Sequence, residues 1–275
     1  MNRLKFLLIT FSAIALMVGI YSCAKDTADT SKSLSNANDP IVESRMSGSA
    51  CNPQTLFTEY SSCTHITKTN VPISFALGNL YNTSSKLYQL CPNIVINVTY
   101  TYSKCIIGAT GSEVHFIRDL SYNLTSIIAA CPALQAEINY QQSIGNLVSF
   151  LDFLDDDISR QVEFTEVYNA AISSPNKYKC PPFGDNFYSV KYIKNTCYKW
   201  TVLLDPSTTD PKHVIAKKDC GSTVCCARSN KYCVLGFEDG KPNILIGQSQ
   251  DYQKFEGTCT QECTHDCGAL DPNSF

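Results

Sequence analysis

Residues 94–102, IVINVTYTY, alternate between two kinds of side chain. Every even position holds a large apolar or aromatic residue, and positions 97, 99 and 101 hold asparagine or threonine. Successive side chains of a β-strand point to opposite faces, and β-branched and aromatic residues favour strands. The stretch therefore predicts a half-buried strand with one face on a hydrophobic core.

A helical period follows this strand. From Pro132 onward, apolar residues recur about every 3.6 positions, which predicts one amphipathic helix with a kink at Gly145. Apolar residues between 120 and 128 indicate a shorter helix before it. Residues 51–175 are thus expected to form an α+β part, a half-buried sheet with a packed helix. The helical positions are Leu134, Ile138, Leu147, Val148, Leu151, Leu154 and Ile158, preceded by Leu120, Leu124, Ile127 and Ile128.

The remaining residues, 176–275, predict a cysteine-rich and mostly β part. Residues 187–193 and 197–204 are expected to be strands, as are residues 232–237 and 243–247. The last two runs flank Asp239-Gly240, and Asp-Gly between apolar runs favours a tight hairpin turn.

The first 22 residues have the layout of an export signal. Arg3 and Lys5 precede an uncharged run at residues 6–20. A retained transmembrane helix is the alternative, but such a helix needs about 20 apolar residues. Secretory signals use a shorter run of about 7–15. We therefore expect residues 1–22 to be a signal peptide that is removed on export.

Residues 20–23, Ile-Tyr-Ser-Cys, resemble the lipobox of bacterial lipoproteins, in which an aliphatic, a variable and a small residue precede the acylated cysteine. The resemblance implies lipidation of Cys23 and anchoring at the outer membrane or cell surface. Tyr21 stands where the family usually has a small residue, and a cleaved signal with a chance cysteine is the alternative. Residues 24–50 hold few apolar residues and no aromatic one, so residues 23–50 predict a lipidated cysteine with a flexible tether.

Cysteine usage predicts disulfide bonds. Fifteen cysteines are an odd number for an exported chain, and assigning Cys23 to lipid leaves fourteen. Five of them precede residue 132 and nine follow residue 179, so complete pairing requires a bridge between residues 51–131 and 180–267. Neighbouring side chains of a strand point apart, so Cys225 and Cys226 should have different partners. The fourteen cysteines are Cys51, Cys63, Cys91, Cys105, Cys131, Cys180, Cys197, Cys220, Cys225, Cys226, Cys233, Cys259, Cys263 and Cys267.

Composition argues against one class of partner. The chain of 275 residues has a formal net charge of −3, and removal of residues 1–22 makes it more negative because Arg3 and Lys5 are lost. Nucleic acid binding requires a basic face, so no nucleic acid partner is expected. The 44% share of hydrophobic residues is sufficient for a packed core.

Two clusters have residue types that bind metal ions, but neither has a suitable spacing. Cys259, Cys263 and Cys267 with His265 lack the C-x2-C pairs of zinc sites, so disulfides are expected instead. The acidic run at residues 152–157 lacks the D-x-D-x-D-G spacing of a calcium loop and is predicted to be a solvated helix face. No metal and no cofactor are expected.

No catalytic motif stands out. The chain lacks G-x-S-x-G, H-E-x-x-H and a phosphate-binding loop, and Ser174–Lys177 matches S-x-x-K only at chance frequency. We therefore expect a non-catalytic binding, adhesion or envelope protein whose partners are the membrane, through its lipid, and an unknown protein or glycan ligand. An inhibitor is another non-catalytic possibility. The alternative is an anchored hydrolase with dispersed catalytic residues, which a pocket holding His115 or His213 near a carboxylate and a serine would indicate.

Overall fold

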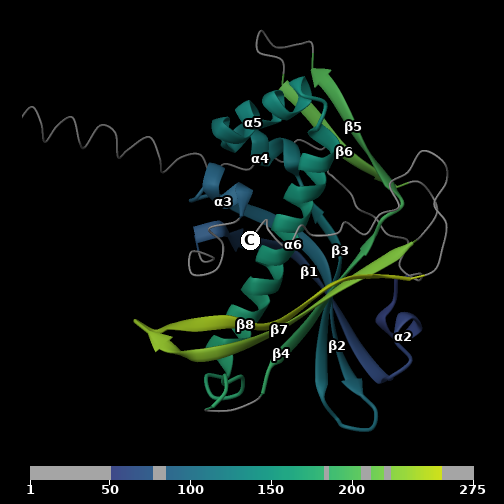
Figure 1. Ribbon diagram of the computed structural model, residues 1–275, viewed down its shortest axis with the longest axis vertical. Helices are drawn as coiled ribbons and strands as arrows, with labels where there is room; N and C mark the ends of the chain where they lie inside the picture. The colour runs from purple at the N-terminus through teal and green to yellow at the C-terminus, as the bar shows by residue number, and fades with distance from the viewer. Residues whose placement is uncertain (1–50, 77–84, 183–185, 206–211, 220–223, 256–275) are drawn as a thin grey trace, which may run out of the picture. The chain divides into compact units, whose positions relative to one another are not determined.

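Six strands of the described chain form one mixed sheet in the computed structural model (Figure 1), in the order β1-β2-β3-β4-β7-β8. The structure describes residues 51–76, 85–182, 186–205, 212–219 and 224–255. Strands β3 and β4 are parallel, and the other neighbours are antiparallel. The strands are β1 (Tyr60–Ser74), β2 (Val95–Ile107), β3 (Glu113–Tyr122), β4 (Tyr188–Asn195), β7 (Cys225–Glu238) and β8 (Lys241–Lys254). A separate antiparallel pair comprises β5 (Tyr198–Asp205) and β6 (Lys212–Asp219).

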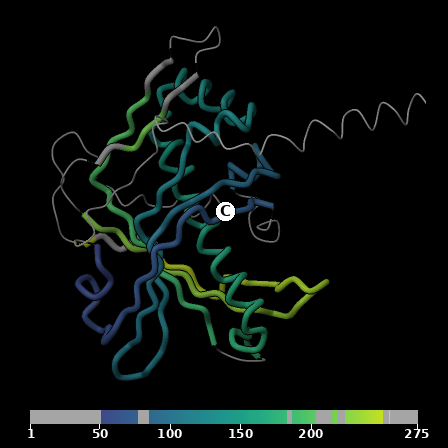
Figure 2. The backbone as a smooth tube through the Cα atoms, turned by 180° about the vertical axis from the view of Figure 1, so that it is seen from behind, coloured from purple at the N-terminus to yellow at the C-terminus, as the bar shows by residue number. Residues whose placement is uncertain are grey.

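One long helix, α6, lies across one face of this sheet (Figure 1). A parallel pair such as β3 and β4 needs a crossover connection, and the helical segment that contains α6 supplies it. A second apolar cluster includes Phe57, Tyr60 and Phe116, and Phe116 points to the sheet face opposite that of its neighbour Ile117 in the main core. Figure 2 shows the path of the backbone from behind. The helices are α2 (Pro53–Leu56), α3 (Lys86–Leu90), α4 (Leu124–Ala130), α5 (Pro132–Ser143) and α6 (Leu147–Ser173).

The fold class predicted from the sequence, α+β, is confirmed. Strand β2 contains the alternating stretch, and Ile96, Val98 and Tyr100 are buried on its core face. The hairpin between β7 and β8 turns at Asp239 and Gly240, whose φ angles of 49° and 76° are those of a tight two-residue turn.

The helical prediction was partly wrong. The single kinked helix is two helices, because Gly145 has a φ of 73° and the chain leaves the helical conformation there. Helix α6 also continues to Ser173, well past the last predicted apolar position, Ile158. Leu120 belongs to strand β3 and not to the short helix, which begins at Leu124 after the capping residue Asn123.

The acidic run of α6 was predicted to face solvent, and this prediction was wrong. Asp155, Asp156 and Asp157 are all buried, as are Glu163 and Glu166 further along the helix. Burying a carboxylate is costly unless it is paired or hydrogen-bonded, so each of these groups requires a partner. Arg160 of α6 itself pairs with Asp156 Oδ2 at 2.9 Å, and the other partners come from elements packed around α6.

Arg228 of β7 is the central partner. Its guanidinium is fully buried and donates to Asp156 Oδ1 at 2.6 Å, to Ser159 Oγ at 3.1 Å and to Glu163. The second carboxylate oxygen of Glu163 accepts from Asn230 Nδ2 at 2.6 Å and from the Tyr232 hydroxyl at 3.1 Å. One buried cation and its neighbours on β7 therefore hold two consecutive parts of α6 against the sheet.

The other carboxylates of α6 attach further elements. Asp155 pairs with Lys217 of β6 at 2.8 Å, and Asp152 accepts from the Tyr198 hydroxyl and the Trp200 indole of β5, so the β5–β6 pair is tied to the helix. Asp157 accepts from the Leu87 amide at 3.0 Å and fixes the start of α3. Burial raises the pKa of Asp157 to about 6, and the hydrogen bonds from the Leu87 amide and the Ser85 hydroxyl offset this effect only in part.

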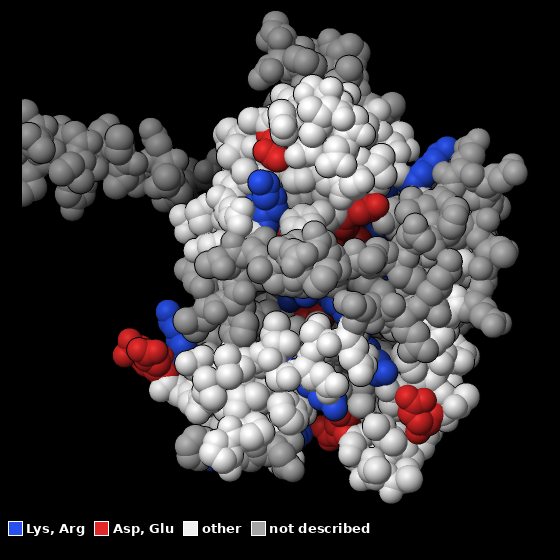
Figure 3. All heavy atoms as spheres, in the orientation of Figure 1, with Lys and Arg blue, Asp and Glu red and all other residues white. Residues whose placement is uncertain are grey.

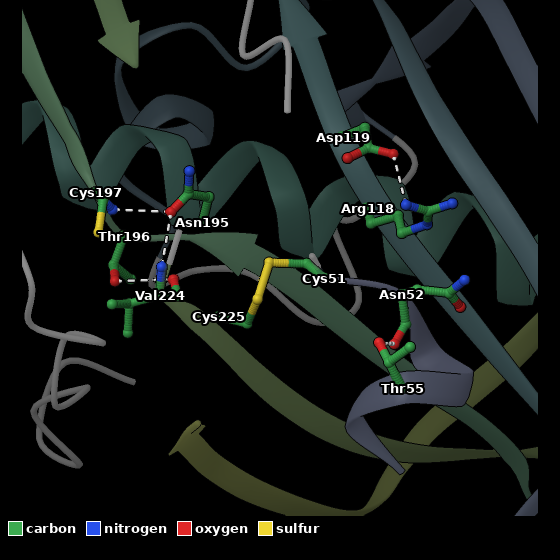
Figure 4. The surroundings of a disulfide bond; sticks show 10 residues. All are labelled: Cys51, Asn52, Thr55, Arg118, Asp119, Asn195, Thr196, Cys197, Val224 and Cys225. Atoms are coloured by element: carbon green, nitrogen blue, oxygen red, sulfur yellow. Dashed lines mark hydrogen bonds and ion pairs between the residues drawn. A yellow bond between two sulfur atoms is a disulfide. The ribbon is translucent and has the colours of Figure 1, made fainter. Parts of the chain in front are cut away.

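Four disulfide bonds are placed in the described residues: Cys51–Cys225, Cys63–Cys105, Cys91–Cys131 and Cys180–Cys233. The first, shown in Figure 4, joins residues 51–131 to residues 180–267 and is the crossing bridge that the cysteine count requires. Cys197 and Cys226 are also disulfide-bonded, and the partner of Cys225 is Cys51, not its neighbour. The parts divided at residue 175 in the sequence share one sheet.

This disulfide content indicates a protein that folds outside the cytoplasm, because cytosolic thiols are kept reduced. Cys23, Cys220, Cys259, Cys263 and Cys267 lie outside the described residues, as do the signal peptide and the tether. Within the described chain, no helix is both long and apolar enough to cross a membrane.

Candidate binding site

A cavity of about 600 Å³ opens where β3 and β4 diverge. These parallel strands pair only from His115↔Val190 to Ile117↔Tyr192, so the first residues of β3 do not pair with the first residues of β4. The space between them is lined by the β2–β3 turn, the segment after α6 and the start of β4, with Lys231 of β7. The lining residues are Ile107, Gly111, Ser112, Glu113, Val114, His115, Lys177, Tyr178, Asn186, Phe187, Ser189 and Lys231.

Several covalent and backbone contacts hold this wall in place. The Cys180–Cys233 disulfide fastens the segment after α6 to β7, and Val234 of β7 donates its amide to the Tyr178 carbonyl at 2.6 Å. Phe187 packs against Gly247 of β8 so closely that an added Cβ at Gly247 would overlap the ring. The site is therefore assembled from segments more than 70 residues apart in sequence (Ser112 to Phe187) on a braced frame.

Some charged groups of the cavity form ion pairs with each other, and one does not. Glu113 is held by Lys104 at 2.7 Å and by Lys177 at 3.0 Å, and these bonds lower the pKa of its carboxyl to about 2. Hydrogen bonding to Glu113 raises the pKa of Lys177. Lys231 is exposed, and no residue in the described part of the chain forms an ion pair or hydrogen bond with its ammonium. The cavity thus combines one carboxylate with three ammonium groups at or beside it.

His115 is a buried, neutral wall of the cavity. Its ring stacks on Tyr188 with centroids 4.1 Å apart, and its Nδ1 lies 2.6 Å from the Tyr102 hydroxyl. Burial lowers the pKa of His115 to about 4, an effect that Glu113 opposes and Lys104, Lys177 and Lys68 reinforce. At neutral pH this imidazole is a hydrogen-bonding aromatic surface and not a cation.

The other sequence candidates do not join this site. His65 of strand β1 lies with its Nδ1 2.7 Å from the Ser103 hydroxyl of β2, and its pKa is lowered by burial and by the charge of Arg118. Neither His65 nor His115 hydrogen-bonds a carboxylate within the described chain. The His213 side chain and His265 lie outside the described residues. No group of three or more potential metal-ligating residues is placed to hold an ion in the described ranges.

The charges visible on one face of the molecule do not mark another site among the described residues. On the face shown in Figure 3, the described acidic and basic residues are interspersed and do not form one extended patch of a single sign. Comparisons with protein-family models, with curated proteins and with solved structures found no match to this chain. The cavity is therefore the candidate binding site of the described chain.

The sequence alone did not reveal this cavity. His115, Lys177 and Ser174 were considered for catalysis, but Lys231 and Phe187 carried no signal because each lies in an ordinary strand pattern. The separation of Glu113 from Ser189 along the chain hides the site until β3 and β4 are paired.

The buried neutral state of His115 predicts a pH-dependent stability difference. An unfolded histidine has a pKa near 6.5, so acidification from pH 7.5 to 5 adds a proton to the unfolded chain but not to the folded one, whose His115 pKa is about 4. The stability of the protein relative to a His115→Phe variant should fall by about 2 kcal/mol over this range. Urea unfolding of both proteins, with disulfides intact, measures it. A difference that stays constant or grows on acidification would contradict the buried neutral imidazole.

Proposed function

We propose that this chain is an exported lipoprotein, anchored at the outer membrane or cell surface through Cys23, that binds a ligand in the cavity between β3 and β4 without catalysing a reaction. The cavity is the observation that carries the binding role. Its volume of about 600 Å³ lies within the usual range for small-molecule sites, and its walls combine aromatic, hydroxyl and charged groups.

The protonation states of the lining residues favour binding over catalysis. A general acid or base needs a pKa near the working pH. The Glu113 carboxyl has a pKa of about 2 and His115 one of about 4, while the pKa of Lys177 is raised, which keeps this lysine protonated. Fixed charges and a neutral aromatic ring are suited to recognising a ligand. The alternative, a hydrolase, would need a lining residue with a pKa near neutral pH, and Glu113, His115 and Lys177 do not provide one.

The disulfide framework supports a role outside the cell's reducing compartments. A domain held by bridges between distant segments, such as Cys51–Cys225, keeps its shape where chaperones are scarce and proteases are present. The lipobox-like residues 20–23 supply the proposed attachment, and two or more acyl chains suffice for stable anchoring.

The anchor can be tested by fractionation of cells that express the full chain. Cys23→Ser should move the protein from the membrane pellet to the soluble fraction, because the acylated thiol is lost. Tyr21→Ala is the matched control, since it brings the lipobox closer to the family pattern and should leave the protein in the pellet. A Cys23→Ser protein that still sediments with membranes would show that Cys23 is not the anchor.

The binding role can be tested by closing the cavity. Ser189 of β4 is half-buried in its wall, so Ser189→Trp should fill the space. The full chain in detergent is applied to arrays of glycans and of peptides. For each array member that the wild type binds, the affinity of Ser189→Trp should be at least tenfold lower. The control variant Ser62→Trp changes an exposed serine of β1 outside the cavity and should bind the same members with unchanged affinity.

Two outcomes of the array experiment would contradict the binding role of the cavity. If the wild type binds no array member, or if Ser189→Trp keeps every ligand, the cavity is not the binding site and the proposed function is wrong.

A further inference from the structure

The charge of the cavity departs from that of the chain. The whole chain has a net charge of −3, yet Lys177 and Lys231 line the cavity, Lys104 pairs with Glu113 beside it, and Glu113 is the single carboxylate among the described residues of the lining. Two of these cations neutralise Glu113 together and leave one positive charge in excess, and Lys231 adds another. A local surplus of positive charge in an acidic protein favours an anionic ligand.

Lys231 is the cation that remains available to a ligand. It lies on β7 directly opposite Ser189 of β4, and both residues line the cavity. Directly opposed side chains of an antiparallel pair project from the same face of the sheet about 5 Å apart. The ammonium of Lys231 and the hydroxyl of Ser189 can therefore reach one acceptor group together, and the Ser112 hydroxyl enters from the β2–β3 turn.

The rest of the lining is suited to an apolar or flat body attached to that acceptor. Ile107, Val114 and Phe187 supply apolar surface, and the buried Tyr178 and His115 rings supply flat aromatic surface. Phe187 is itself held by its contact with Gly247. Such a wall removes the carbon skeleton of a ligand from water while the charged end is paired.

We propose that the cavity selects small carboxylates, an inference that rests on the proposed binding function. The ligand carboxylate pairs with Lys231 and accepts a hydrogen bond from Ser189, and its carbon skeleton packs against Phe187. A carboxylate presents two acceptor oxygens, one for the Lys231 ammonium and one for the Ser189 hydroxyl on the opposite strand. Lysine binds phosphate as a point charge, whereas specific phosphate sites add the bidentate fork of arginine or the amides of a helix start, and neither is among the described residues of the lining.

Two sources present this chemistry: an acidic sugar of a glycan and the terminal carboxylate of a peptide. Two pairs of probes distinguish the two sources, and within each pair the compounds differ in whether they carry the charged carboxylate. Methyl glucuronide is compared with methyl glucoside, and N-acetylphenylalanine with its amide. Affinities for the full chain in detergent are measured by calorimetry at 0.15 M salt.

In at least one pair the acid should bind about tenfold more tightly than its neutral partner. Lys231→Met should reduce the acid's affinity to that of the neutral compound and leave the neutral compound's affinity unchanged. Lys241→Met, at the exposed β7–β8 turn outside the lining, is the control and should change neither. Unfolding curves of both variants establish that they are folded.

The outcomes distinguish this inference from the function on which it rests. Preference for glucuronide assigns the ligand to acidic glycans, and preference for the free peptide acid assigns it to peptide termini. Equal binding of acid and neutral compound overturns the carboxylate inference, as does failure of both acids to bind, while array ligands lost in Ser189→Trp would still uphold the cavity as a binding site. Failure of both acids together with an empty array overturns both proposals.

Discussion

Arg228 lies fully buried between two carboxylates of helix α6, Asp156 and Glu163, and the arrangement of the sheet depends on this contact. Removing a charge from water is costly, and only close opposite charges and hydrogen bonds offset that cost. The guanidinium satisfies this condition with α6 in one position over β7. Sliding the helix by one turn would separate Arg228 from both carboxylates and would leave the fully buried Glu163 without its cation.

Strand β7 links this contact to the candidate site. Arg228, Asn230 and Tyr232 point from β7 toward α6, whereas Lys231 projects into the cavity opposite Ser189. The alternation of a strand thus places a buried structural cation and an exposed, unpaired one three residues apart. The disulfides of Cys225 and Cys233 fix the same strand to Cys51 and Cys180, so the position of Lys231 is set by covalent bonds as well as by charge.

Local patterns predicted the parts of the fold that local forces determine. The alternation in IVINVTYTY and the Asp239-Gly240 turn were recognisable because strand faces and positive φ angles follow from adjacent residues. The acidic run was misplaced because periodicity shows which helix face is polar but not whether solvent or Arg228, 72 residues beyond Asp156, covers it. Strand β1 was missed because its outward side chains are mostly polar, as on many edge strands. The cavity could not be predicted, since it arises from the divergence of β3 and β4, which are distant in sequence.

The stability of an Arg228→Met variant tests most directly whether the buried ion pairs hold α6 on the sheet. We expect a loss of about 3–5 kcal/mol in the free energy of unfolding, because the fully buried Glu163 loses its cation and keeps only the Asn230 and Tyr232 side chains, while Asp156 keeps its ion pair with Arg160. Most of that loss should be recovered in the double variant Arg228→Met, Glu163→Gln, which removes the carboxylate left without a cation. A loss below about 1 kcal/mol for Arg228→Met, the range of an exposed ion pair, would contradict the account.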